Sequence, residues 1–183
     1  MSGSDFSFPR FLRPRGARRK SARERSLSKS SSAVPGVFPQ ARHGYFSAKD
    51  GTRIFYSIEG QGPPLVFCYG LVCSSLHWTY QIDFFRKNYQ TIWFDYRGHQ
   101  NSDMPKDMST LSLETIAEDM HTLFEELQLK DAVVLGHSMG VNIVLEFYRR
   151  YPERVRAMVL ANGTSKQPFE TLMGTNAMQS AMD

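Results

Sequence analysis

Hydrophobic and polar residues follow two different periods along the chain from about residue 44 to residue 160. Residues 64–69 and 91–94 are apolar at consecutive positions, as is typical of strands buried on both faces of a sheet. Ahead of them, residues 45–47 and 52–58 flank an Asp50-Gly51 turn, which predicts a β-hairpin. Other segments carry apolar residues every three or four positions, as amphipathic helices do.

The helical segments alternate with the strand segments. Residues 74–88 predict a helix that carries the apolar side chains Leu76, Tyr80, Phe84 and Phe85. Ser112 is a good N-cap for a second helix, whose apolar residues recur from Leu113 to Leu127. A strand over 132–135, a helix from about Met139 to Tyr151 and a strand over 155–160 follow. A hairpin followed by alternating strands and helices predicts an α/β fold whose mostly parallel sheet is covered on both faces.

Both ends of the chain differ from this central part. Residues 1–40 hold nine Lys and Arg against two acids, are rich in Ser, and lack apolar periodicity, so we expect a disordered basic extension. A transit peptide, a solvated basic arm that touches anionic surfaces, and translated leader sequence all fit it. Residues 41–163 form the expected folded core. After Asn162-Gly163, the segment 164–183 predicts one short amphipathic helix over 169–182.

Charge and composition exclude several classes of function. The net charge of +4 comes from the extension, and the charges beyond residue 40 are mixed, so no nucleic-acid footprint is expected. No apolar run reaches about eighteen residues, so no stable membrane insertion is expected. Cys68 and Cys73 suit reduced thiols and form no metal motif. The expected location is cytoplasmic, with targeting to an organelle through the basic extension as the alternative.

The candidate nucleophile is Ser138, in Gly136-His137-Ser138-Met139-Gly140 between a strand and a helix. The G-x-S-x-G pattern in that context is the nucleophile elbow, where a sharp turn lifts the serine oxygen clear of the sheet. The flanking glycines are expected where neighbouring elements leave no room for a side chain. The Met139 N–H lies at the helix N-terminus, where it can stabilise an oxyanion. We expect His137 to be a packed or hydrogen-bonded structural residue, because neighbouring residues at such a turn point in different directions.

Two further segments stand in order before the elbow, Tyr69-Gly70-Leu71 and the segment from Asp95 to Ser102. With the elbow they make residues 44–183 resemble the α/β-hydrolase family. The resemblance implies that the Leu71 N–H is the second oxyanion donor, and that Asp95 and Arg97 are structural. Tyr69 stands where the family has a histidine, and Gln100 stands where it has a second glycine. The segment 164–183 resembles the beginning of a cap or lid.

In the family, the triad acid and histidine follow the serine in the chain. Here the five histidines end at His137, so the triad acid and histidine are not found, and we expect a truncated chain with a sheet incomplete at its C-terminal end. The first hypothesis is a serine hydrolase that acts on a small-molecule ester, acyl or carbon–carbon substrate through an acyl-enzyme on Ser138. No cofactor or metal is implied, and a completing fragment or an oligomer is an expected partner.

Two other hypotheses remain. The first is a catalytically inactive α/β-hydrolase-like module that binds a ligand or a partner. The second, a dinucleotide-binding domain, is disfavoured because no G-x-G-x-x-G follows the first strand-to-helix turn. A serine rather than an aspartate at the elbow argues against epoxide hydrolase and haloalkane dehalogenase chemistry, in which the family's nucleophile is a carboxylate.

Overall fold

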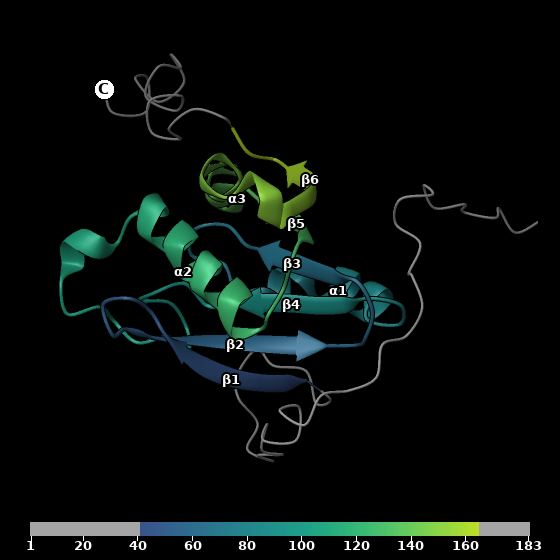
Figure 1. The fold of residues 1–183 in the computed structure, drawn as a ribbon, viewed down its shortest axis with the longest axis horizontal. Coiled ribbons are helices and arrows are strands. Elements are labelled where there is room, and N and C mark those ends of the chain that lie inside the picture. Colours follow the sequence, from purple (N-terminus) through teal and green to yellow (C-terminus); the bar gives the residue numbers. More distant parts are fainter. Residues whose placement is uncertain (1–40, 165–183) are drawn as a thin grey trace, which may run out of the picture.

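The computed structural model describes residues 41–164, which form one six-stranded sheet with helices on both of its faces (Figure 1). The strand order is β1-β2-β4-β3-β5-β6. The elements in chain order are β1 (Arg42–Ser47), β2 (Arg53–Glu59), β3 (Pro64–Cys68), the 3₁₀ helix η3 (Ser75–Trp78), α1 (Thr79–Phe85), β4 (Gln90–Phe94), η4 (Met108–Thr110), α2 (Leu113–Glu126), β5 (Ala132–His137), α3 (Met139–Arg150), η5 (Pro152–Arg154) and β6 (Val155–Ala161).

The N-terminal hairpin forms as the sequence predicts. β1 and β2 pair antiparallel around the Asp50-Gly51 turn, and Gly51 has a φ of +84°, a conformation that favours glycine. β2 also pairs antiparallel with β4, whereas β4, β3, β5 and β6 run parallel to one another. The α/β class, the mostly parallel sheet and the hairpin are therefore confirmed.

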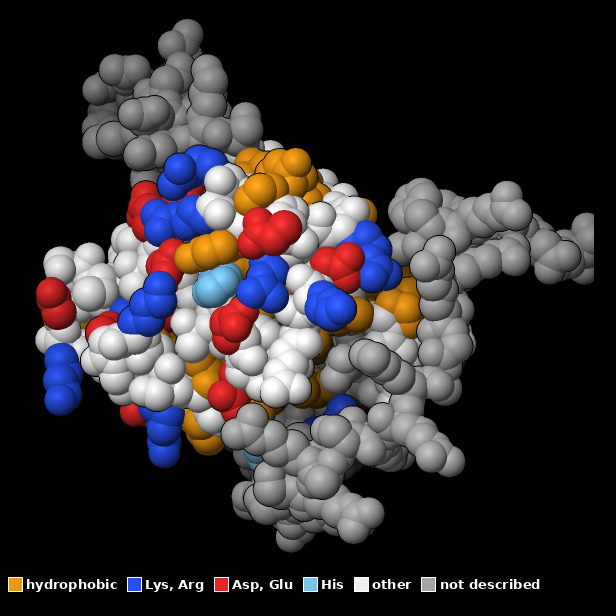
Figure 2. Space-filling model, in the orientation of Figure 1, with side chains coloured by type: hydrophobic (Ala, Val, Ile, Leu, Met, Phe, Trp, Pro, Cys, Tyr) orange, Lys and Arg blue, Asp and Glu red, His pale blue; other side chains and the backbone are white. Residues whose placement is uncertain are grey.

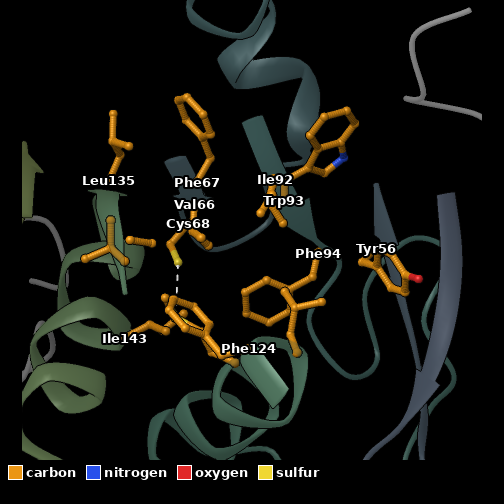
Figure 3. Close-up of a cluster of buried hydrophobic side chains, with 14 of the residues drawn as sticks. Tyr56, Val66, Phe67, Cys68, Ile92, Trp93, Phe94, Phe124, Leu135 and Ile143 are labelled. Carbon is orange, nitrogen blue, oxygen red and sulfur yellow. Dashed lines mark hydrogen bonds between the residues drawn. The ribbon is translucent and has the colours of Figure 1, made fainter. Parts of the chain in front are cut away.

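The sheet separates the core into two halves (Figure 3). Phe67, Trp93 and Leu135 point toward the face that α1 covers, whereas the Cys68 side chain points to the opposite face, where Phe124 lies. Cys68 Sγ lies 4.0 Å from the Met120 sulfur in α2. Successive residues of a strand point to opposite faces, so an uninterrupted apolar run fills both halves.

The predicted helix over 74–88 is only partly correct. The segment forms a short 3₁₀ helix, then α1, which ends at Phe85. Leu76 and Tyr80 are 60% and 86% exposed, whereas Trp78 and Ile82 are buried. Both pairs have the i, i+4 spacing of one helix face, so periodicity alone fits either pair. Packing against the sheet selects the pair with the bulky indole ring. Of the predicted apolar side chains, Leu76, Tyr80 and Phe84 point to solvent and Phe85 packs partly against the core.

The second helix and the elbow region form as predicted, with small shifts of boundary. The Ser112 hydroxyl accepts a hydrogen bond from the Thr115 N–H at 3.2 Å, which caps α2. β5 continues to His137 and β6 to Ala161, two residues and one residue beyond the predicted ends. In the part of the chain that the structure describes, no helix is long and apolar enough to cross a membrane.

β6 forms the outer edge of the described sheet. Its side chains Val159 and Leu160 are about half exposed, and hydrophobic side chains gather at this edge (Figure 2). The predicted basic extension over 1–40 and the predicted helix over 169–182 lie outside the described residues.

Candidate active site

Ser138 lies between β5 and α3, at the edge where the parallel strands end. Its φ of 53° and ψ of −121° place it in a conformation that side chains rarely adopt. The surrounding structure holds this strain, because the Ser138 N–H donates to the Ala161 carbonyl at 3.0 Å and the Val141 N–H donates to the Ser138 carbonyl at 2.9 Å. Ser138 is exposed to solvent, so its hydroxyl is presented above the sheet.

The two glycines of the elbow are required by close backbone contacts. A Cβ atom on Gly136 would lie 2.6 Å from the Gly140 carbonyl oxygen. A Cβ atom on Gly140 would lie 2.3 Å from the Cys68 carbonyl oxygen, on the neighbouring strand β3. Both distances are far below van der Waals contact, so each glycine allows α3 to approach the sheet closely enough to form the turn.

The loop after β3 passes directly beside Ser138. A Cβ atom on Gly70 would lie 3.1 Å from the Ser138 Cβ and 3.5 Å from its Oγ. The loop then turns sharply, with a φ of 52° at Val72 and a hydrogen bond of 3.2 Å from the Cys73 N–H to the Gly70 carbonyl. Within residues 41–164, the N–H groups of Leu71 and Met139 have no assigned acceptor. Both amides therefore meet the first requirement for the role of oxyanion donor that the sequence predicts.

Tyr69 anchors the start of this loop. The side chain is fully buried, its hydroxyl donates to Asp95 Oδ1 at 3.2 Å, and the same hydroxyl accepts the Tyr96 N–H at 3.1 Å. The Tyr96 hydroxyl returns a hydrogen bond of 2.8 Å to the Tyr69 carbonyl. Burial and the nearby Asp95 charge hold the pKa of Tyr69 well above its ordinary value, so the phenol stays a donor. At the position where a histidine was expected, tyrosine ties the β3 loop to the β4 loop.

The loop after β4 is built around Asp95 and Arg97. Asp95 Oδ2 accepts hydrogen bonds from the N–H and the side-chain amide of Asn101, at 3.2 and 2.9 Å. The Arg97 guanidinium is buried and holds Asp119 with two hydrogen bonds of 2.7 Å. Gln100 adopts a φ of 44°, the left-handed conformation for which a glycine was expected. The two charged residues hold loops in place, in agreement with the structural role inferred from the sequence.

The sequence did not predict the ion pair between Arg97 and Asp119. A second branch of the guanidinium binds Asp50 Oδ2 in the hairpin turn at 2.8 Å, so one arginine connects three segments. Asp119 lies within the apolar face of α2, between Ile116 and Met120. A carboxylate within an apolar helix face was the available signal, because a buried charge requires a partner.

None of the histidines among the described residues forms a hydrogen bond with Ser138. His137 stacks on His77 with ring centroids 4.2 Å apart, and its buried Nδ1 has no hydrogen-bond partner in the described structure. Burial and the neighbouring His77 lower the pKa of His137. His121 stacks on Tyr151 in the layer of α2 and α3, at 3.9 Å. His137 is thus a packed residue, and no histidine of residues 41–164 is in hydrogen-bond contact with Ser138.

Neither cysteine forms a disulfide. Cys68 is fully buried, and desolvation raises the pKa of its thiol to about 12, so it is an unreactive core residue. Among residues 41–164, no group of three His, Cys, Asp or Glu side chains is placed to hold a metal ion.

The chain belongs to the alpha/beta hydrolase fold family, because residues 63–182 match the profile of that family. It is 35% identical over 121 residues to bifunctional epoxide hydrolase 2 of Sus scrofa, covering 66% of this chain and 22% of that protein. It is 38% identical over 123 residues to a non-heme chloroperoxidase of Streptomyces lividans, covering 65% of this chain and 44% of that protein.

Solved structures show the same fold. An esterase from Exiguobacterium antarcticum aligns with a TM-score of 0.61 and 30% identity, over 65% of this chain and 44% of the esterase. An epoxide hydrolase from Bacillus megaterium aligns with a TM-score of 0.67 and 28% identity, over 75% of this chain and 49% of that enzyme. The chain thus spans less than half the length of each of these relatives. The family supports a hydrolase function.

Proposed function

We propose that this chain carries the nucleophile and the oxyanion hole of a serine hydrolase that forms an acyl-enzyme on Ser138. The substrate is a small-molecule ester, or a related acyl or carbon–carbon compound. The observation that supports this most directly is the strained elbow at Ser138, with the Gly70 backbone beside it and the free Leu71 and Met139 amides nearby.

In the proposed reaction, Ser138 Oγ attacks the substrate carbonyl carbon and loses its proton to a base. The negative charge that develops on the carbonyl oxygen is stabilised by the N–H groups of Leu71 and Met139. The tetrahedral intermediate collapses, the leaving group departs with a proton, and Ser138 is left esterified. Water then attacks this ester, which releases the acid and restores the hydroxyl.

The chemistry of a serine favours an acyl substrate over an epoxide, although several relatives are named epoxide hydrolases. If Ser138 Oγ opened an epoxide, the product would be an ether, which water does not cleave at an ordinary active site. A carboxylate nucleophile forms an ester in the same step, and water can hydrolyse that ester. Turnover on Ser138 therefore requires a carbonyl substrate.

In this proposal the base comes from outside the described residues, because no histidine among them forms a hydrogen bond with Ser138. Of the acids that follow the nucleophile, Glu146 is paired with Arg149 and Arg150 on α3. We propose that a completing segment, on another fragment or in an oligomer, supplies the triad histidine and acid. Loss of the base alone typically lowers turnover by about three to six orders of magnitude.

A binding module without turnover is the second candidate. It is favoured by the same observation, that no histidine of the described residues reaches Ser138. Such a module would bind a ligand at the exposed Ser138 hydroxyl and the loop beside it without transferring an acyl group.

The test uses the purified full-length chain with a fluorophosphonate probe and a series of p-nitrophenyl esters. Labelling of the wild type, its loss in Ser138→Ala and its retention in Ser109→Ala, an exposed serine on η4, would support the proposal. If the chain alone does not label, the same assay is run on the chain purified under native conditions with any completing segment or second copy still bound. A folded, monodisperse complex of that kind that does not label would reject the catalytic proposal and leave the binding module.

The two unpaired cysteines support a reducing compartment, which we propose to be the cytoplasm. Imaging of a C-terminally tagged chain with and without residues 1–40 tests this location. Organelle staining that depends on residues 1–40 would overturn it.

A further inference from the structure

A pair of stacked histidine rings connects the elbow at Ser138 with the segment that follows the loop of Leu71. His137 precedes Ser138 at the end of β5, and His77 lies in η3, the first element after the loop that carries Leu71. Their ring centroids are 4.2 Å apart with an interplanar angle of 28°. The Trp78 ring lies nearly perpendicular to the His137 ring, with centroids 6.3 Å apart, so it packs against the same side chain.

The tip of the loop between these contacts is exposed, whereas Cys73 packs partly against the core and Trp78 packs on Phe67. Leu71 and Val72 are 51% and 90% exposed, so their side chains pack on little of the described structure. The loop is fixed at its start by the buried Tyr69, through the hydrogen bonds to Asp95 and Tyr96. At its other end, η3 meets the elbow through His77. The position of the Leu71 N–H relative to Ser138 therefore depends on both anchors.

We propose that His77 and His137 are positioning residues. Their stacked rings hold the loop of residues 70–74, which carries the Leu71 N–H, in a fixed position relative to Ser138. This inference rests on the proposed function, because the Leu71 N–H matters to catalysis only if Ser138 forms a covalent intermediate. Neither histidine takes part in proton transfer in this account. The interaction requires a flat aromatic ring at position 77, and it does not require the imidazole nitrogens.

The electrostatics of His137 agree with this role. The pKa of His137 is lowered, first by burial and then by His77, so its surroundings disfavour the charged imidazolium. Its buried Nδ1 has no partner in the described structure, as suits a ring held by stacking.

The test compares the full chain with its His77→Ala and His77→Phe variants by two measurements. The first is hydrogen–deuterium exchange of the backbone amides of residues 70–74, and the second is the rate of fluorophosphonate labelling. We expect His77→Ala to raise exchange in this loop and to slow labelling about tenfold, since displacing one oxyanion donor loses part of the 10²–10³-fold effect of removing it. His77→Phe keeps a flat ring and should restore both. Leu76→Ala, at an exposed position of the same 3₁₀ helix, is the matched control and should change neither.

The outcomes separate this inference from the proposed function. Wild-type exchange and labelling in His77→Ala, or equal defects in the Phe and Ala variants, would overturn the positioning role while Ser138 stays reactive. If even the wild type fails to label but His77→Ala still loosens residues 70–74 and His77→Phe restores them, the serine-hydrolase proposal fails and the anchoring of the loop stands.

Discussion

The hydroxyl of Tyr69 donates a hydrogen bond of 3.2 Å to Asp95, which links the ends of two neighbouring parallel strands below the nucleophile. Tyr69 follows β3 and Asp95 follows β4, and the two strands pair in parallel register. Since the carboxyl ends of parallel strands meet at one edge of the sheet, a single phenol can hold both of the loops that border Ser138.

Tyr69→Phe removes this link without changing the shape of the ring. The Tyr96 N–H would lose its acceptor and Asp95 would lose one donor in a buried site. We expect the free energy of unfolding to fall by about 1–3 kcal/mol, the usual cost of leaving buried polar groups unpaired. Urea titration measures the change. The control is Tyr80→Phe at an exposed position, and equal stabilities for the two variants would contradict the prediction.

Gly140→Ala tests the close approach of α3 to β3. Alanine normally stabilises a helix relative to glycine by about 1 kcal/mol. Here the added methyl group would lie 2.3 Å from the Cys68 carbonyl oxygen, so we expect a loss of about 3 kcal/mol instead. Gly51→Ala, where the added methyl group meets nothing within 4 Å, should cost only about 1 kcal/mol through its positive φ. Thermal unfolding of both variants shows which one loses more stability. A Gly140→Ala variant that is more stable than the wild type would disprove the clash.

Gln100→Gly tests the strain in the loop after β4. Gln100 has a φ of 44°, and glycine adopts that conformation without steric cost, so we expect a gain in stability of up to about 1 kcal/mol. Gln81→Gly in α1 has no strain to relieve and should lose about 1 kcal/mol. Chemical denaturation of the two variants should give changes of opposite sign, and a loss in both would refute the prediction.

The pH dependence of stability should reveal how much the ionised carboxylate of Glu118 in α2 stabilises the fold. Hydrogen bonds from Lys49 and Tyr151 lower the pKa of this carboxyl from 4.5 to about 2. Because the folded-state pKa is depressed, the stabilisation is complete above the unfolded-state pKa of about 4.5 and is lost as the pH falls toward 2.

We therefore expect Glu118→Gln to lower the free energy of unfolding by about 1 kcal/mol at pH 7 and to match the wild type near pH 2. Denaturation at several pH values measures the gap, and the exposed Glu126→Gln is the control. A gap that persists unchanged at pH 2 would show that the ionised carboxylate is not responsible.

Much of the fold could be predicted because the signals are local. The consecutive apolar residues of β3 and β4 require burial on both faces, and an Asp50-Gly51 turn fits a hairpin without reference to the rest of the chain. The elbow at Ser138 was found in the same way, because the glycines and the serine have fixed spacing between a strand and a helix.

The sequence by itself therefore determined the order of strands and helices, the hairpin, and the residue that stands at the elbow. Only the tertiary structure decided which face of η3 and α1 is buried, that Arg97 meets Asp119, and that His77 stacks on His137. Each of these contacts joins segments that adjoin only once β4, β3 and β5 lie side by side. Periodicity reports how a segment faces its surroundings, whereas the identity of its neighbour is fixed by the packing of the whole sheet.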